Sequence, residues 1–199
     1  MGKKALKATK SKIVSAAWRL FYEQGYEDTT VDEIITLSGT SKGSFYHYFD
    51  GKDALLGSLA YLFDEEYERL AANLPADMNT IDLLCYLNRE LCGMIENRVD
   101  IHLLTRLYST QLTTKGEKHL LDHNRVYYKL LRKLVLAGQE KGELTKEKSV
   151  NDIVRLYAMA ERALLYDWCL CGGDYSLQDY AGSVMPMFLA GLKPAEKES

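Results

Sequence analysis

Long stretches without proline, filled by apolar residues at helical spacing, constrain the fold of this 199-residue chain most strongly. Proline occurs only at Pro75, Pro186 and Pro194. Because proline interrupts helices, its scarcity favours helices over a loop-rich β fold. The first apolar stripe, from Ile13 to Phe21, steps by three and four residues, as on one helix face. No useful length of sequence alternates apolar and polar residues as a strand does.

Turn and capping residues divide this pattern into about nine helices, which predicts an all-α fold. Thr30 and Glu33 have the spacing of a capping box, and Gly39 and Ser41 suit the end of one short helix and the start of the next. Asp50-Gly51 breaks the chain again. A long fourth helix is expected at 52–74, and further helices at 79–97, 100–112, 117–141, 147–171 and 177–191.

Two short helices that meet across residues 38–41 have the plan of a helix-turn-helix, whose second helix enters the DNA major groove. Gly39 fits so tight a turn because glycine adopts a positive φ at low cost. Ile34, Ile35 and Phe45 are expected to pack inward. The exposed face of the second helix is expected to present Ser41, Lys42, Gly43, Ser44, His47 and Tyr48.

Side chains near this second helix carry donors that DNA binding can use. Tyr46, Tyr48 and Lys52 suit phosphate oxygens, and Lys42 and His47 have the reach for base edges. Each of them also fits a solvated surface group, and the aromatic cluster at 45–49 also fits a core. The local charge does not decide between DNA contacts and an ordinary protein surface either. Residues 1–19 hold six basic residues and no acid, which fits either a frayed tail or an arm along phosphates, whereas the whole chain is −3.

The sequence lacks several motifs that would indicate export, a membrane span or a metal site. No signal-peptide core and no run of about 20 apolar residues occur, so we expect a cytoplasmic protein without membrane contact. The four cysteines form no CxxC pair and are expected to act as small hydrophobes. His119 and His123 are four residues apart on the helix expected at 117–141, but no third ligand follows, so we expect neither a metal nor a cofactor.

Residues 12–60 resemble the DNA-binding domain of the TetR family of transcriptional regulators. The matching residues are Ala17, Phe21, Gly25-Tyr26, Thr30-Val31, Ile34, Gly39, Ser41-Lys42-Gly43, Tyr46, Tyr48-Phe49 and Lys52 through Leu55. Three residues depart from the family pattern: Ile35 and Ser38 stand where alanine is usual, and Thr40 stands where valine is usual. The larger Ile35 puts the angle between the two helices in doubt.

The resemblance implies roles for individual residues. Tyr46, Tyr48 and Lys52 would hold phosphates, Lys42, Gly43, Ser44 and His47 would face bases, and Thr30 would meet the DNA backbone. It also implies a DNA-binding domain at residues 1–51 and a ligand-binding and dimerisation bundle at 52–192. The polar composition of residues 193–199 predicts a disordered tail. A dimer of this kind would read a double-stranded, pseudo-palindromic operator.

Beyond residue 60 the resemblance is mainly architectural. Residues 137–144 resemble the end of the family's seventh helix, and residues 164–192 resemble its last two helices, which pair with a second copy. The interface expected for a homodimer includes Leu164, Trp168, Tyr180, Val184 and Phe188. An unidentified small-molecule effector is expected to bind within the bundle. Its candidate pocket comprises Tyr86, His102, Arg106, Tyr108, Tyr127, Tyr157 and Glu161.

Alternatives remain open at this stage. The tyrosines also fit an ordinary core or interface, and Glu161 and Arg162 also fit a dimer salt bridge or surface charges. A repressor that releases DNA on binding its effector is the leading hypothesis, although the sequence does not encode the sign of regulation. An enzyme is disfavoured because no nucleophile elbow, phosphate loop or paired-carboxylate motif occurs. The remaining alternative is a helical interaction protein that does not bind DNA.

Overall fold

A computed structural model describes residues 2–113 and 118–194 of the chain. In these residues all regular structure is helical, with ten α-helices and two 3₁₀ helices, which confirms the predicted all-α fold. None of their helices is both long enough and apolar enough to cross a membrane. The chain forms two compact units, Met1–Tyr61 with His102–Leu120, and Leu62–Ile101 with Leu121–Ser199. The predicted functional domains stay a prediction, and residues 195–199 of the predicted tail lie outside the described part.

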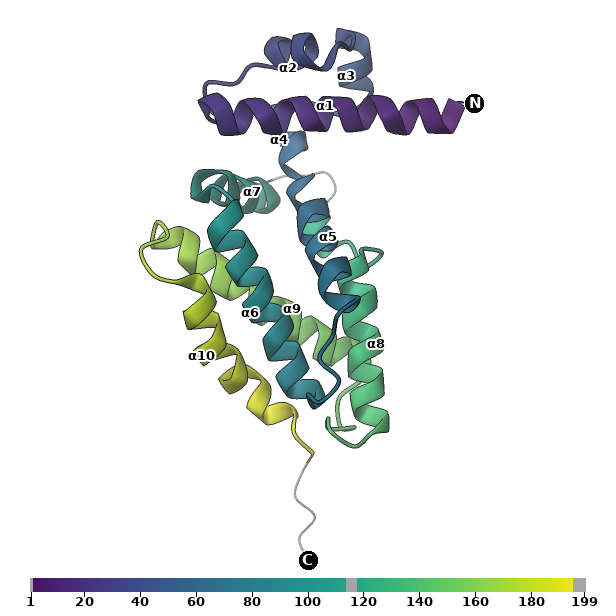
Figure 1. Cartoon of the computed structure of the whole chain (residues 1–199), viewed down its shortest axis with the longest axis vertical. Coiled ribbons are helices and arrows are strands. Elements are labelled where there is room, and N and C mark those ends of the chain that lie inside the picture. Colours follow the sequence, from purple (N-terminus) through teal and green to yellow (C-terminus); the bar gives the residue numbers. More distant parts are fainter. Residues whose placement is uncertain (1, 114–117, 195–199) are drawn as a thin grey trace, which may run out of the picture. The chain divides into compact units, whose positions relative to one another are not determined.

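The first unit contains the three N-terminal helices, α1 (Gly2–Gln24), α2 (Val31–Ser38) and α3 (Lys42–Tyr48). Figure 1 shows α2 and α3 lying along the same side of α1. Ile13, Phe21, Ile34 and Phe45 are almost fully buried between the three helices, because each belongs to the apolar face of its own helix. The basic segment before Ile13, expected as a tail or an arm, is the first part of α1.

A break interrupts the predicted fourth helix, so that prediction is wrong. The chain forms α4 (Lys52–Leu56) and α5 (Leu59–Ala71) in place of one helix over 52–74. The Ser58 hydroxyl donates to the carbonyl of Leu55 (2.5 Å) and accepts from Trp18 Nε1 (2.6 Å). The His119 ring lies directly against Gly57, where a Cβ would collide with it. The helix therefore breaks where contacts from distant residues meet it.

The first unit also includes most of α7 (Ile101–Thr113) and the start of the 3₁₀ helix η1 (His119–Leu121). The helix predicted over 117–141 is wrong in its first part. Helix α8 begins only at Val126, after η1 and a turn in which the Asn124 N–H donates to the Asp122 carboxylate (2.9 Å). An aspartate side chain that bonds the backbone two residues on favours a turn over a helix.

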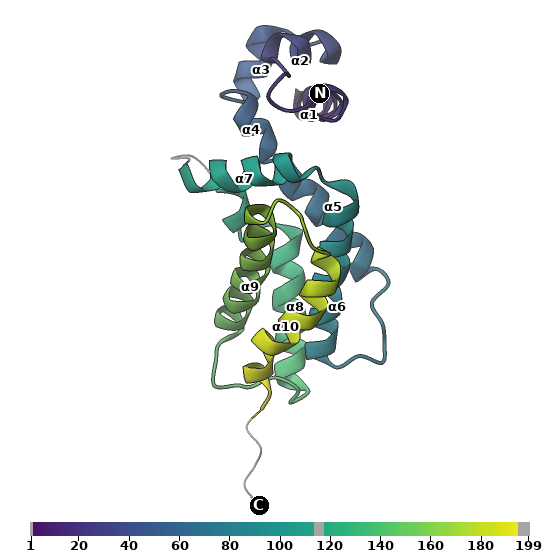
Figure 2. The ribbon, with the colours of Figure 1, turned by 90° about the vertical axis from the view of Figure 1, so that its left-hand side faces the viewer.

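The second unit is a bundle that contains most of α5 together with α6 (Thr80–Arg98), α8 (Val126–Glu140), α9 (Val150–Leu170) and α10 (Leu177–Leu189). Helix α6 contacts both α8 and α10, and α9 contacts the same two helices. Figure 2 shows α9 next to α8, which it contacts. The short η2 (Ala190–Leu192) follows α10, and Thr145 donates from its N–H to the carbonyl of Leu192 (2.8 Å). This bundle supplies a core of its own.

Gly138 permits the close approach of α8 to α6, and we expect its replacement by alanine to destabilise the bundle. A Cβ at this position would lie 2.7 Å from both Cγ2 and Oγ1 of Thr80, a buried residue whose hydroxyl also donates to Glu143 (2.6 Å). Overpacking of this kind costs about 1–3 kcal/mol. Urea unfolding of Gly138→Ala measures the loss. Gly191→Ala is the control, because nothing lies within 4 Å of a Cβ there, and equal stability of the two variants would contradict the packing.

Candidate functional site

The turn between α2 and α3 is fixed by hydrogen bonds within the segment. Thr30 Oγ1 accepts from the Glu33 N–H (3.3 Å), and the Glu33 carboxylate accepts from the Thr30 N–H (2.7 Å), which confirms the capping box. Gly39 has a φ of +62°, and Ser41 caps α3 by accepting from the Ser44 N–H (3.1 Å). Both helices therefore begin at a side chain that accepts from one N–H group of the first turn, and the turn between them is formed by local hydrogen bonds.

The outward face of α3 carries the residues that the sequence assigns to DNA. Ser41, Lys42, Gly43 and His47 are exposed, the Tyr46 side chain is 49% exposed, and Ser44 and Tyr48 are half-buried. Phe45 is fully buried beneath them, whereas Ile35, expected to pack inward, is only half-buried. Lys42 is the cation of this face and lies 3.4 Å from Asp32 in an exposed ion pair. Such a pair is weak, so the lysine is available to another anion.

Lys52 and Thr30 have partners inside the protein. Lys52 Nζ donates to the carbonyls of Tyr26 (2.6 Å) and Glu27 (3.2 Å) and lies 4.3 Å from the centre of the Tyr26 ring. The ammonium therefore joins α4 to the loop between α1 and α2. Thr30 uses its hydroxyl in the capping box. Their contacts with the DNA backbone stay predictions.

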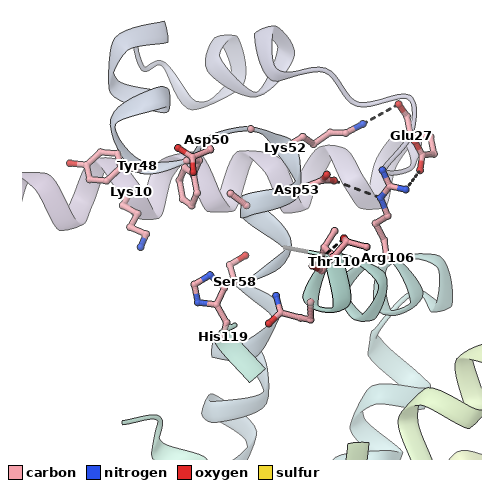
Figure 3. Close-up of a pocket in the computed structure, with 16 residues that line it drawn as sticks. Lys10, Glu27, Tyr48, Asp50, Lys52, Asp53, Ser58, Arg106, Thr110 and His119 are labelled. Atoms are coloured by element: carbon pink, nitrogen blue, oxygen red, sulfur yellow. Dashed lines mark hydrogen bonds and ion pairs between the residues drawn. The ribbon is translucent and has the colours of Figure 1, made fainter. Parts of the chain in front are cut away.

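A hollow of about 800 Å³ lies within the first unit, between the residues around α4 and one side of α7 (Figure 3). Arg106 on α7 reaches across it to Asp53 (3.6 Å) and Glu27 (3.9 Å). Tyr26 hydrogen-bonds the same Asp53, and burial together with this carboxylate raises the pKa of the Tyr26 hydroxyl, which stays protonated. These polar contacts tie α7 to the N-terminal helices, and the charges that line the hollow largely neutralise one another.

The seven residues predicted to form an effector pocket are divided between the two units. His102, Arg106 and Tyr108 lie on α7 in the first unit, where only Arg106 lines the hollow. Tyr86, Tyr127, Tyr157 and Glu161 belong to the second unit. The sequence predicts a single pocket because α7 lies between two bundle helices along the chain. This position does not reveal that α7 belongs to the first unit.

Glu161 is the centre of a buried polar cluster in the second unit. Glu161 is only 6% exposed. Oε2 accepts a hydrogen bond from the Tyr67 hydroxyl (2.5 Å) and another from Asn88 Nδ2 (3.1 Å). Burial raises the pKa of the Glu161 carboxyl, and these hydrogen bonds oppose that rise. The cluster thus joins α5, α6 and α9 through one carboxyl group.

Tyrosine rings surround this carboxyl group. The ring centre of Tyr127 lies 4.9 Å from that of Tyr67 and 6.5 Å from that of Tyr157. The Tyr157 hydroxyl donates to the carbonyl of Leu84 (3.1 Å), whereas the buried hydroxyl of Tyr127 has no hydrogen-bond partner among the described residues. Sequence reasoning missed Tyr67 and Asn88. Asn88 could have been found, since it is a polar residue beside Leu84, Leu87 and Leu91 on one helix face.

Several large apolar side chains are exposed on α9 and α10, and they differ in part from the predicted interface residues. Leu164 and Trp168 are each 4% exposed and pack inside their own subunit. Val184 is half-buried, while Tyr180 and Phe188 are exposed, and their place in an interface stays a prediction. The exposed apolar side chains, here called the outer face, are Met159, Tyr166 and Leu170 on α9 and Tyr180, Met187 and Phe188 on α10. Large exposed apolar groups gathered on neighbouring helices are typical of protein interfaces.

The two histidines considered for metal binding are not on one helix. His119 lies on η1 and His123 follows it, before α8 begins. The His123 ring packs 4.6 Å from that of Tyr128. In the described part of the chain, no group of three His, Cys, Asp or Glu side chains has an arrangement that could hold a metal ion. The spacing argument for a histidine pair therefore fails.

Comparison with known proteins yields a family and several relatives. The family model described as bacterial regulatory proteins, tetR family, matches residues 13–59. The transcriptional regulator TtgR of Pseudomonas putida is 26% identical over 181 residues, which cover 84% of this chain and 83% of that protein. QacR of Staphylococcus aureus, another transcriptional regulator, is 26% identical over 164 residues, which cover 78% of this chain and 81% of its own.

Solved structures share the fold. Thermus thermophilus FadR, a TetR family transcriptional repressor solved in complex with lauroyl-CoA, superposes with a TM-score of 0.73. The match covers 95% of this chain and 97% of that one at 22% identity. The likeness therefore extends beyond residues 13–59 to the helical bundle.

Proposed function

Because the chain belongs to the TetR family of transcriptional regulators, we propose that it is a homodimeric repressor of a palindromic DNA operator. Helix α3 of each subunit would enter the major groove of one half-site. A small molecule that binds among the helices of the second unit would release the operator. The relatives named above are transcriptional regulators, and this chain is likewise a regulator and not an enzyme.

The observation that carries the DNA-binding part of the proposal is the outward face of α3. A short helix with a rigid, capped N-terminus presents Lys42, Gly43, Tyr46 and His47 outward. Gly43 leaves space for close approach, since only Ser41 Oγ lies within 4.0 Å of a Cβ there. Tyrosine and lysine suit phosphate oxygens, and Lys42 and His47 suit base edges. The face is therefore equipped for both positioning and sequence recognition.

The outer face of α9 and α10 supports the homodimer. Leu170 is 67% exposed and Met187 is 76% exposed, which is unfavourable for an isolated subunit. A two-fold dimer would bury the same surface of both copies. It would also supply the second α3 that a palindromic operator requires.

Release of the operator would depend on the links between the two units. The backbone passes from one to the other at residues 61–62, 101–102 and 120–121, so the second unit is joined to the first on both sides of α7. Helix α7 in turn reaches Tyr26, Glu27 and Asp53 through Arg106. A ligand that favours one arrangement of the bundle would thereby bias the N-terminal helices, provided that its affinity differs between the two states.

The proposal is tested by selecting DNA from a random pool with the purified full-length chain. We expect an inverted repeat whose half-sites are separated by about one or more helical turns, and binding that weakens steeply as salt rises. Enrichment of no sequence at all, or of a site without two-fold symmetry, would contradict the proposed function. A reporter placed behind the selected site then shows whether its occupation represses transcription.

A further inference from the structure

Glu161 is a buried acid without an ion pair. Among the described residues no lysine or arginine forms a salt bridge with it, although acidic side chains this deeply buried are normally paired. The charge of Arg125, the residue that precedes α8, acts on Glu161, but Arg125 is already paired with Asp64 of α5 (3.0 Å). The bundle therefore holds one acidic group more than its internal cations balance at this point.

The groups that face Glu161 are neutral hydrogen-bonding groups. They come from every helix packed around it, and they are Tyr67 on α5, Asn88 and Cys92 on α6, Tyr127 on α8 and Tyr157 on α9. Burial, and then the charge of Glu161, raise the pKa values of the three tyrosines, so these hydroxyls stay protonated. The cluster can donate hydrogen bonds, but it contains no positive charge.

Tyr127 gives a second observation at the same cluster. Its hydroxyl is buried without a hydrogen bond, and an unsatisfied buried hydroxyl is destabilising. The same ring lies between those of Tyr67 and Tyr157. The Tyr127 hydroxyl, which faces Glu161, therefore lies beside this acid with no partner at hydrogen-bonding distance among the described residues.

We infer that the effector is an organic ammonium compound, whose charged nitrogen binds between Glu161 and Tyr127. The inference rests on the proposed function and names the class of molecule that its ligand site takes. An ammonium group donates hydrogen bonds, so it can satisfy the Tyr127 oxygen and the Glu161 carboxylate together. The surrounding tyrosine rings attract a cation through their faces. A carboxylate, sulfate or phosphate would instead be repelled by the negative charge of Glu161.

Proton release distinguishes this mode of binding from simple apolar burial. A bound cation favours the ionised form of Glu161, which burial disfavours in the free protein. Below the pKa of the free carboxyl, ammonium binding therefore displaces a proton, and affinity rises with pH by up to about tenfold per unit. Above that pKa the affinity becomes constant. A neutral ligand of the same shape has no such slope.

The test compares three ligands that share one aromatic chain, 4-phenylbutylamine, 4-phenylbutanol and 4-phenylbutyrate, with lauroyl-CoA as a fourth probe. Titration calorimetry on the full-length dimer measures binding of each to wild type, Glu161→Gln, Tyr127→Phe and Glu140→Gln. We expect the amine to bind the wild type most tightly, and Glu161→Gln to lose about 10- to 100-fold of that affinity. Glu140→Gln, an exposed acid on α8, keeps wild-type affinity.

Tyr127→Phe keeps the test valid if Glu161→Gln fails to fold. It removes only the hydroxyl that lacks a partner, so the bundle should keep its stability while the amine binds several-fold more weakly. The inference is overturned if the amine does not bind, if the alcohol, the butyrate or lauroyl-CoA binds more tightly, or if both variants bind the amine like wild type. Operator binding is measured in parallel. If lauroyl-CoA makes the Glu161→Gln variant release the operator as readily as it does the wild type, the inference fails while the proposed function stands.

Discussion

Tyr46→Ala should lower the affinity for the selected operator by about 100-fold or more and leave the dimer intact. Tyr46 is 49% exposed on α3, and its ring packs edge to face with that of the buried Phe45, with 5.3 Å between ring centres. Its removal therefore costs little stability. Each dimer would lose two phosphate contacts, and a hydrogen bond to a charged group contributes about 1.5–3 kcal/mol. A mobility-shift titration measures the affinity, and sedimentation measures the dimer.

The matched control for this variant is Tyr22→Ala. Tyr22 is also an exposed tyrosine of the first unit, 53% exposed, but it lies on α1 and not on α3. Operator affinity should change little. If Tyr46→Ala binds like wild type, or if both variants lose affinity equally, α3 does not make the contacts assigned to it.

Phe188→Glu should convert the dimer into a monomer and thereby abolish tight operator binding. Phe188 belongs to the outer face and is 46% exposed in the single subunit. A two-fold interface would bury two new carboxylates side by side, and burying unpaired charges costs several kcal/mol. Sedimentation equilibrium should give the mass of one chain, while circular dichroism shows unchanged helix content.

Leu136→Glu serves as the control for the interface. Leu136 is 49% exposed, close to the value for Phe188, but it lies on α8 and not on the outer face. This variant should remain a dimer and bind the operator. A Phe188→Glu protein that is still dimeric would place the interface elsewhere, and a monomeric Leu136→Glu would do the same.

Features whose partners lie within a few residues were predictable from the sequence. The capping box of Thr30 and Glu33, the positive φ of Gly39 and the Ser41 cap are all confirmed. Each depends on hydrogen bonds that span three to five residues, so residue type and spacing determine it. The starts of three later helices have the same local origin, because α6, α9 and α10 begin at the capping residues Asn79, Ser149 and Ser176.

Features that depend on distant partners were not predictable. The break between α4 and α5 depends on Trp18 and His119, which are 40 and 62 positions away from Ser58 and Gly57. The helical period of that segment continues through the break and conceals it. Likewise, the cluster around Glu161 depends on Tyr67, 94 positions away, so Glu161 could be singled out from the sequence but its hydrogen-bond partner could not.

The face of a helix that turns outward is a further case. Leu164 and Trp168 belong to the same apolar helix as Tyr166 and Leu170, and hydrophobicity alone does not separate them. Packing separates them, because Leu164 and Trp168 turn into the bundle, where the Trp168 ring nitrogen donates to the carbonyl of Tyr175 (2.9 Å). The residues left outside are those that a second subunit would cover.

The most direct test of the account compares the selected full operator with a DNA duplex that carries only one of its half-sites. Binding is followed by fluorescence anisotropy, and the number of chains per duplex is measured by sedimentation. Two α3 helices reading two half-sites predict two chains on the full site and an affinity for it at least about 100-fold higher than for the half-site. Equal affinity for the two duplexes, or one chain on the full site, would contradict the account.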